Sequence, residues 1–122
     1  MKLILILILL FSLKGYSQNP DVIVGKWIKA NKEDLIIEVF KVNDEYNGKV
    51  SWSRDNKKPI GFLMLENLRY NQKSKNWEGG KIHDPNSNRS YDATLAMQSD
   101  GTLEVSGNVL FFKIKRAFKK VR

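Results

Sequence analysis

The organisation of this chain is clearest in the stretch WEGGKIHDPNSNRSY, residues 77–91. An aromatic residue stands at each end, with a glycine pair and an Asp-Pro dipeptide between them. The Asp84 side chain can accept hydrogen bonds from backbone amides two residues on, and Pro85 has a fixed φ. These residues predict a turn between two antiparallel strands, and they contain no recognised catalytic signature.

The glycine pair in this stretch predicts a β-bulge. Strict alternation from Trp77 would turn Lys81 and His83 inward with the tryptophan, and an unpaired buried charge is costly. One extra residue at Gly79–Gly80 would move every later side chain to the opposite face of the sheet. We therefore expect a disrupted ladder at this pair, a buried Ile82 and an exposed His83.

Apolar and polar residues also alternate outside this stretch, which is typical of half-buried strands. Clusters of Asn, Asp, Gly and Pro separate the alternating segments, as expected for tight turns. No period of 3.6 persists for a dozen residues. The clearest strand-like segments are residues 35–42, 46–53, 91–97 and 103–109.

The spacing of these segments predicts about eight short strands joined in chain order. An open sheet of that size would leave two pairing edges. We therefore expect an all-β fold, a small antiparallel eight-stranded up-and-down barrel. Such a barrel is just wide enough to be filled by side chains or to hold one small ligand. A two-sheet sandwich is the alternative architecture.

The N-terminus predicts export. A short positive start precedes an almost unbroken apolar run at residues 3–13, which is well below the roughly 20 residues that span a bilayer. Small residues favour cleavage before Gln18. We expect a signal peptide at residues 1–17 and a single domain at residues 18–122, located in the periplasm or outside the cell. An uncleaved N-terminal anchor is the alternative.

Composition narrows the partners. The chain contains no cysteine, which excludes disulfides and thiolate metal sites. Its net charge is +8, and loss of Lys2 and Lys14 with the signal peptide leaves +6. A positive surface favours anionic partners such as acidic lipid headgroups or polyanionic glycans. We expect neither nucleic acid as a partner of an exported protein nor a transmembrane anchor on the mature chain.

Several motifs together resemble a known family. Gly25-Lys26-Trp27 resembles the glycine–any–tryptophan tripeptide that opens lipocalins, and WEGGKIHDP is more specific. With Tyr46, Trp52, Tyr91 and residues 103–107, these motifs look like the bacterial domain of unknown function 2147 family, over essentially the whole mature chain. The resemblance implies an exported lipocalin-like antiparallel barrel. It implies no established activity.

Residues with catalytic chemistry are few. His83 is the only histidine, and beside Asp84 it either acts as a general base or enters a turn. A glycosidase would need two carboxylates that face each other at a defined separation, which sequence spacing does not reveal. We expect no enzyme, no metal and no cofactor, and a hydrolase is the least favoured hypothesis. The carboxylates near the middle of the chain, all expected to face solvent, are Glu66, Glu78, Asp84 and Asp92.

Five aromatic residues are the candidate ligand-binding residues. Trp27, Trp52 and Trp77 are each expected at an inward-facing position of a different strand. Tyr46 and Tyr91 could line the same cavity for an apolar or planar ligand. The alternative is a solid core, in which Trp27 closes the barrel floor as it does in lipocalins.

The C-terminal run at residues 113–122 mixes basic and apolar residues. Its lysines could bind anionic lipid or keep a strand edge soluble. Members of the family that the chain resembles usually end the last strand in a tryptophan, where this chain has Phe118. We predict an exported lipocalin-like protein that binds a small apolar or lipid-like ligand inside the barrel. The alternative is a cell-envelope protein whose basic face meets anionic lipids or glycans.

Overall fold

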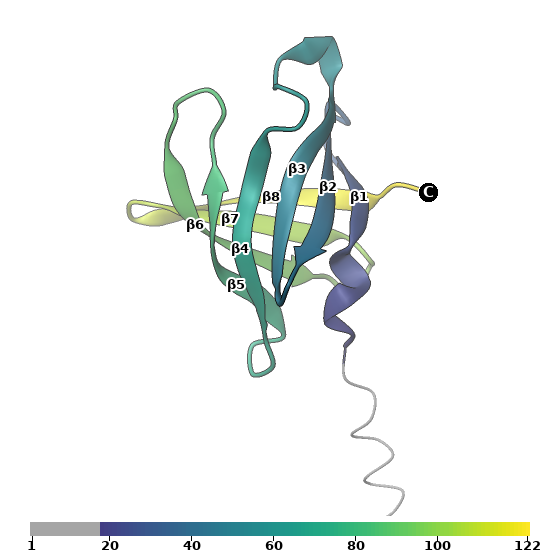
Figure 1. Ribbon diagram of the computed structural model, residues 1–122, viewed down its shortest axis with the longest axis vertical. Coiled ribbons are helices and arrows are strands. Elements are labelled where there is room, and N and C mark those ends of the chain that lie inside the picture. Colours follow the sequence, from purple (N-terminus) through teal and green to yellow (C-terminus); the bar gives the residue numbers. More distant parts are fainter. Residues whose placement is uncertain (1–17) are drawn as a thin grey trace, which may run out of the picture.

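A computed structural model describes residues 18–122 as one closed barrel of eight antiparallel strands in chain order (Figure 1). The expected up-and-down barrel is confirmed, and the sandwich is excluded. The predicted signal peptide, residues 1–17, lies outside the described residues. The strands are β1 (Gly25–Lys29), β2 (Leu35–Val42), β3 (Glu45–Ser53), β4 (Leu63–Asn71), β5 (Asn76–His83), β6 (Ser90–Met97), β7 (Leu103–Val109) and β8 (Phe112–Lys120), with short 3-10 helices η1 (Pro20–Ile23) and η2 (Arg54–Asn56).

Alternation along the strands builds the core. In β2, for example, Leu35, Ile37 and Val39 are buried while the residues between them are only half-buried, as the two-residue period of a strand requires. Every strand contributes at least one buried apolar side chain. The strands and this core all lie between residues 20 and 120 of the described chain. Because apolar burial drives folding, we expect residues 18–122 to fold on their own.

A register shift in β3 turns Trp52 outward. Ile36 pairs with Trp52, and the next residue of β2 pairs with Val50, so Ser51 is an extra residue in the ladder. An extra residue moves later side chains to the opposite face, and Trp52 is 41% exposed. The expectation that Trp52 faces inward is therefore wrong. Ser53 occupies the buried position instead.

The predicted bulge at Gly79–Gly80 is confirmed. The β5–β6 ladder shifts between Trp77 and Gly80, and Gly79 has a φ of 81°, which glycine adopts without steric cost. Trp77 is fully buried, and Ile82 packs partly buried against the core. His83 follows on the opposite face of the strand and is half-buried, somewhat more covered than expected.

The short helix η1 packs against one end of the barrel, where Ile23 is fully buried. Three aromatic side chains of the barrel donate hydrogen bonds to it. In each case the N–H or O–H group of the side chain finds an acceptor in η1 while the ring stays buried in the core. These hydrogen bonds therefore hold η1 against the core. The bonds run from Trp27 Nε1 to Ile23 O (2.9 Å), from Trp77 Nε1 to Pro20 O (3.0 Å) and from Tyr46 Oη to Asp21 Oδ1 (2.5 Å).

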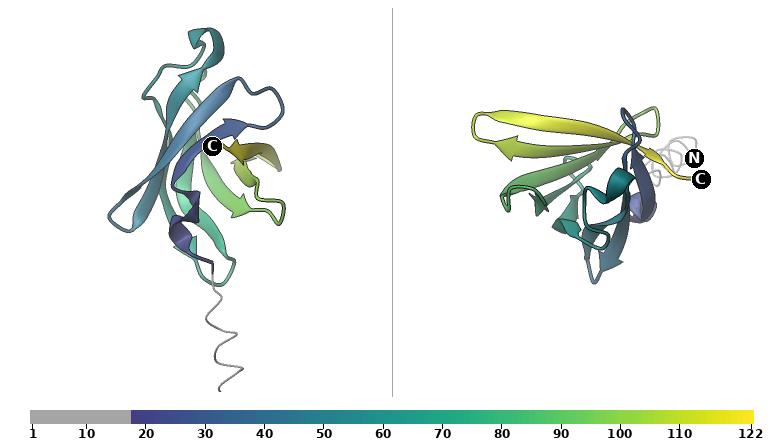
Figure 2. Two further views of the ribbon diagram at one scale, coloured as in Figure 1. Left: turned by 90° about the vertical axis from the view of Figure 1, so that its right-hand side faces the viewer. Right: turned by 90° about the horizontal axis from the view of Figure 1, so that it is seen from above.

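The barrel closes through a short seam between β1 and β8. In the described chain, three residues of β1, Trp27–Lys29, pair with Phe118–Lys120. The β7–β8 hairpin pairs over its full length, but β6 accompanies β7 only as far as Gly107. The end of this hairpin, residues 108–113, therefore projects beyond the neighbouring strands, as the right-hand view of Figure 2 shows.

The helices of the described chain are both short. None of them has the length and apolar character that a membrane-crossing helix needs.

Candidate functional site

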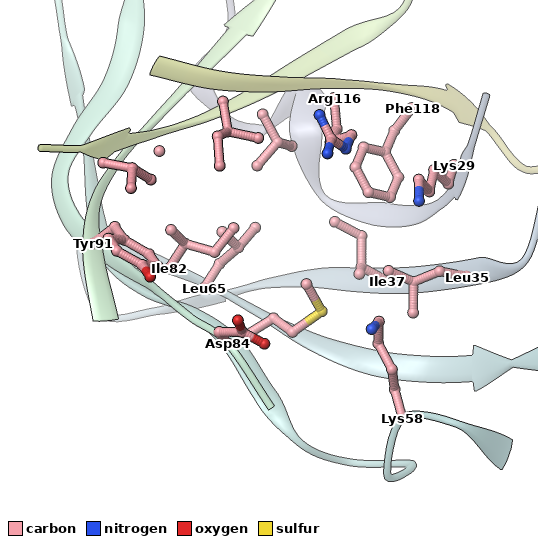
Figure 3. A pocket seen from close by; sticks show the side chains of 15 residues that line it. Lys29, Leu35, Ile37, Lys58, Leu65, Ile82, Asp84, Tyr91, Arg116 and Phe118 are labelled. Carbon is pink, nitrogen blue, oxygen red and sulfur yellow. The ribbon is translucent and has the colours of Figure 1, made fainter. Parts of the chain in front are cut away.

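The barrel contains a cavity of about 290 Å3 (Figure 3). It meets β1 at the last residue of that strand, Lys29, and therefore lies toward the end of the barrel opposite η1. Its volume is at the lower end of the roughly 300–1,000 Å3 that is typical of ligand pockets. Most of its wall is apolar, including Leu35, Ile37, Leu65, Ile82, Val105 and Phe118.

Four charged side chains also line the cavity. Lys29, Lys58 and Arg116 line the cavity with Asp84, which gives three cations to one carboxylate. Figure 3 shows Lys29 and Arg116 on either side of Phe118. The cavity therefore combines an apolar interior with a rim that is predominantly positive.

Arg116, like Lys58, is a cation of this rim without a carboxylate partner in the described chain. It lies opposite Val105 in the β7–β8 ladder and shares its inward-facing side. Lys29 Nζ, by contrast, lies 3.8 Å from Asp34 Oδ1. Among residues 18–122, no carboxylate oxygen lies within 4.0 Å of the Arg116 guanidinium. Its hydrogen bond goes to the backbone oxygen of Lys115, at 2.8 Å.

Asp84 has the turn-forming role that the sequence predicts. Its carboxylate accepts hydrogen bonds from the Asn86 amide and the Ser87 hydroxyl, both at 2.9 Å. The pKa of Asp84 lies below its ordinary value, chiefly because its carboxylate accepts the hydrogen bond from the Asn86 amide. The Ser87 hydroxyl and the charge of Lys58 lower this pKa further. Asp84 is therefore ionised at neutral pH and already occupied by its own turn, which leaves Arg116 available to a ligand.

The five aromatic candidates lie in three different places. Tyr91 lines the cavity. Trp27, Tyr46 and Trp77 are buried at η1 and are not part of the cavity wall. Trp52 lies on the outer face of β3.

His83 belongs to a hydrogen-bonded group on the outer face of the barrel. Its Nδ1 lies 2.6 Å from Ser90 Oγ, and its Nε2 lies 2.9 Å from Glu66 Oε1. The three residues come from neighbouring strands β4, β5 and β6. Hydrolysis by a nucleophilic serine also requires a concave site with hydrogen-bond donors for the oxyanion. His83 does not line the cavity, although its neighbour Ile82 does. This group is accounted for as a cross-strand network.

The described chain gathers no metal site. Within residues 18–122, no three His, Asp or Glu side chains come together as a metal ion would require.

The C-terminal basic run is divided between two faces of β8. Lys113, Lys115 and Lys119 alternate with Arg116 and therefore point outward. Lys115 Nζ lies 4.0 Å from Glu104, and Lys119 Nζ lies 3.5 Å from Glu33. The run thus forms no single basic face of the kind that the envelope hypothesis requires.

Sequence reasoning missed the three cations of the rim. Arg116 lies within the mixed basic run at residues 113–122, yet counting back by two from an inward Phe118 places it inside the barrel. Lys29 stands two residues after Trp27 and follows from the same count. Lys58 lies in the loop between β3 and β4, where no periodicity applies.

Comparison with known proteins agrees with this architecture. The model of a family described as uncharacterized proteins conserved in bacteria, DUF2147, matches residues 25–120. A solved structure of protein HP1028 from Helicobacter pylori, described as belonging to the lipocalin family, is similar to this chain with a TM-score of 0.65. The two sequences are 16% identical, and the likeness covers 82% of this chain and 83% of that one. No curated protein sequence matched.

Proposed function

The chain belongs to the DUF2147 family of uncharacterized proteins conserved in bacteria, and we propose that it binds a small amphipathic molecule with an anionic end in the cavity of its lipocalin-like barrel. The observation that carries the proposal is the unpaired Arg116 at the rim of an apolar cavity. The proposal makes the protein a carrier or receptor of its ligand and not an enzyme.

Apolar burial supplies the affinity. The cavity is lined by residues of every strand except β3. Each apolar Å2 of ligand removed from water contributes about 25 cal/mol. A cavity of this size encloses a short chain or a single ring system, and the remainder of a longer ligand would lie at the open rim.

The cations orient the ligand. A guanidinium presents its N–H donors in a fixed fork that matches a carboxylate or phosphate. Arg116 and Lys29 stand on the two strands of the seam, and Lys58 extends from the facing loop. A ligand therefore enters with its apolar part inward and its anionic end at the rim.

We also propose that the protein acts outside the cytoplasm. The support is the apolar run at residues 3–13, which has the length of a signal-peptide core. Cleavage before Gln18 would release the described barrel. Mass spectrometry of the protein recovered from cell fractions tests this, because processed protein begins at Gln18.

A pair of matched ligands tests the binding proposal. A medium-chain fatty acid and the fatty alcohol of equal chain length are titrated against residues 18–122 by displacement of a fluorescent fatty-acid probe. We expect both to bind and the acid to bind more tightly, by about two- to fivefold for an exposed ionic contact.

Two variants of adjacent residues provide the control. Arg116→Gln should abolish the preference for the acid, whereas Lys115→Gln, whose side chain points outward on the same strand, should retain it. Equal loss of preference in both variants would show a general charge effect and contradict the oriented mode. Failure of the probe and both ligands to bind would exclude the proposed function.

A further inference from the structure

The end of the β7–β8 hairpin exposes apolar side chains without a partner. Leu110 is 89% exposed, Phe111 is 100% exposed and Phe112 is 61% exposed. All three stand where the hairpin projects beyond its neighbours, with Leu110 and Phe111 forming the turn itself. We call Leu110–Phe112 the apolar tip. A contiguous exposed apolar group of this kind marks an interaction surface.

The backbone of the apolar tip has a conformation that is unfavourable for the leucine that occupies it. Leu110 has a φ of 53°, a conformation in which glycine and asparagine are favoured. A two-residue hairpin turn ordinarily takes those residues at this position. Here the chain places a leucine there, so the local structure is less favourable than it needs to be. Such an outlier points to a functional demand on the side chain.

One lysine stands beside the apolar tip. From residue 105 to residue 122 the sequence contains no acidic residue. Lys113 follows the tip directly and points outward from β8. In the described chain, Lys113 takes part in no ion pair within 4.0 Å. Exposed apolar side chains with a free lysine beside them suit an anionic bilayer.

We propose that the apolar tip docks the barrel on an anionic lipid bilayer, with Leu110 and Phe111 inserted among the acyl chains and Lys113 at the headgroups. A bilayer suits a convex turn because it needs no complementary surface. A stable dimer needs about 800 Å2 from each partner, which two turn residues and their half-exposed neighbours do not supply.

The apolar tip lies close to the cavity. Val109 and Ile114, which flank the apolar tip, both line the cavity. The docked hairpin would therefore hold the rim of the barrel close to the membrane surface. The inference does not depend on the proposed ligand, because the tip and the rim are tested by different variants.

Vesicle flotation tests the docking. Residues 18–122 are mixed with vesicles of phosphatidylethanolamine and phosphatidylglycerol, and separately with vesicles of phosphatidylcholine. The wild type should float with the anionic vesicles, less so at high salt because screening weakens the lysine contacts. Combined Leu110→Gly and Phe111→Ser substitution should weaken binding at least about tenfold, since burial of each side chain is lost.

Two control variants separate the tip from general effects. Ile60→Ser replaces an apolar residue of the β3–β4 loop that is 60% exposed. This variant should leave flotation unchanged. The tip variant should be at least as thermally stable as the wild type, because glycine relieves the φ of Leu110. Lys113→Glu should weaken flotation more than Lys73→Glu, which lies in the β4–β5 turn.

Three outcomes would overturn the inference. These are equal flotation of wild type and tip variant, equal loss in the Ile60→Ser control, and a wild-type dimer in light scattering that the tip variant dissociates without any vesicle binding. The last outcome would assign the apolar tip to self-association. Arg116→Gln should not change flotation, so failure of docking and failure of ligand binding remain distinguishable.

Discussion

Gly79 and Gly80 are neighbours, yet the barrel needs each of them for a different reason. Gly79 adopts a φ of 81° with open space where a side chain would begin. Gly80 has ordinary backbone angles, but a Cβ there would stand 2.2 Å from the backbone oxygen of Glu66 on β4. The first glycine supplies the bulge conformation, and the second allows two strands to approach.

This difference predicts unequal costs of substitution. Gly80→Ala forces rigid backbone apart and should destabilise the barrel by about 2–4 kcal/mol. Gly79→Ala meets no atom and should cost about 1–2 kcal/mol for its left-handed conformation. Urea denaturation of both variants measures the difference. Equal costs, or a larger cost at Gly79, would show that the strands separate more easily than the structure implies.

The two bulges also show what the sequence can reveal at the scale of single residues. The bulge in β5 carries a glycine pair and would otherwise bury Lys81, so it was predictable. The bulge in β3 occurs at Ser51, and neither Ser51 nor Trp52 signals a change of face. Trp52 is apolar and matches either face of a strand, which is why its outward position could not be predicted.

At the scale of elements, η1 depends on an acidic and a phenolic side chain. The hydroxyl of Tyr46 donates to Asp21, which also lies 3.2 Å from Lys41 Nζ. The Tyr46 hydrogen bond, ahead of Lys41, lowers the pKa of Asp21. Burial, followed by the hydrogen bond and charge of Asp21, raises the pKa of Tyr46 well above its ordinary range.

These opposite shifts predict a stability window for Tyr46→Phe. The lowered pKa of Asp21 stabilises the fold above pH about 4, and this part is lost as the pH falls further. The raised pKa of Tyr46 stabilises the fold below pH about 10, and this part is lost as the pH rises further. The variant should therefore melt at a lower temperature than the wild type, with the largest difference between these limits.

Thermal melts across pH test this window, with Tyr91→Phe as the control. Within the described chain the Tyr91 hydroxyl has no hydrogen-bond partner. The difference in melting temperature between Tyr91→Phe and the wild type should therefore not change at the two pH limits given for Tyr46→Phe. A Tyr46→Phe deficit that persists undiminished at both extremes of pH would mean that ring packing, and not the hydrogen bond to Asp21, anchors η1.

Elements also show why the candidate site was only partly predictable. The barrel, its strand ranges and the Asp84 turn follow from periodicity and turn chemistry. The aromatic residues are candidates for the cavity wall because they are large and apolar, and a solid core closed by Trp27 is the alternative. Trp27, Tyr46 and Trp77 instead bond to backbone and side-chain atoms of η1, and no pattern in their own strands encodes that distant contact.

For the whole molecule, the β1–β8 seam spans the fewest residues of any junction between neighbouring strands, and we expect it to be the weakest part of the closed barrel. It joins three residue pairs, Trp27–Lys29 with Phe118–Lys120, whereas β4 and β5 pair over most of their length. Additional contacts hold the seam at its edge, including Lys120 Nζ above the Trp27 ring at 4.9 Å. Opening at the seam would turn the barrel into a sheet with two edges, and we expect it to be the least costly way to separate two neighbouring strands.

This weakness predicts where ligand binding will be seen. Without ligand, amides of Ile28 and Lys119 should exchange with deuterated solvent faster than those of the β4–β5 ladder, because local opening costs less than global unfolding. Lys29, Arg116 and Phe118 bring both sides of the seam to the cavity. A ligand in contact with them stabilises the closed state by mass action, by about 2.7 kcal/mol at a hundredfold excess over its Kd. Saturating fatty acid should therefore slow exchange at the seam far more than at the opposite ladder. Slowing that is uniform around the barrel would indicate global stabilisation, and slowing confined to the β7–β8 turn would place the fatty acid on the apolar tip.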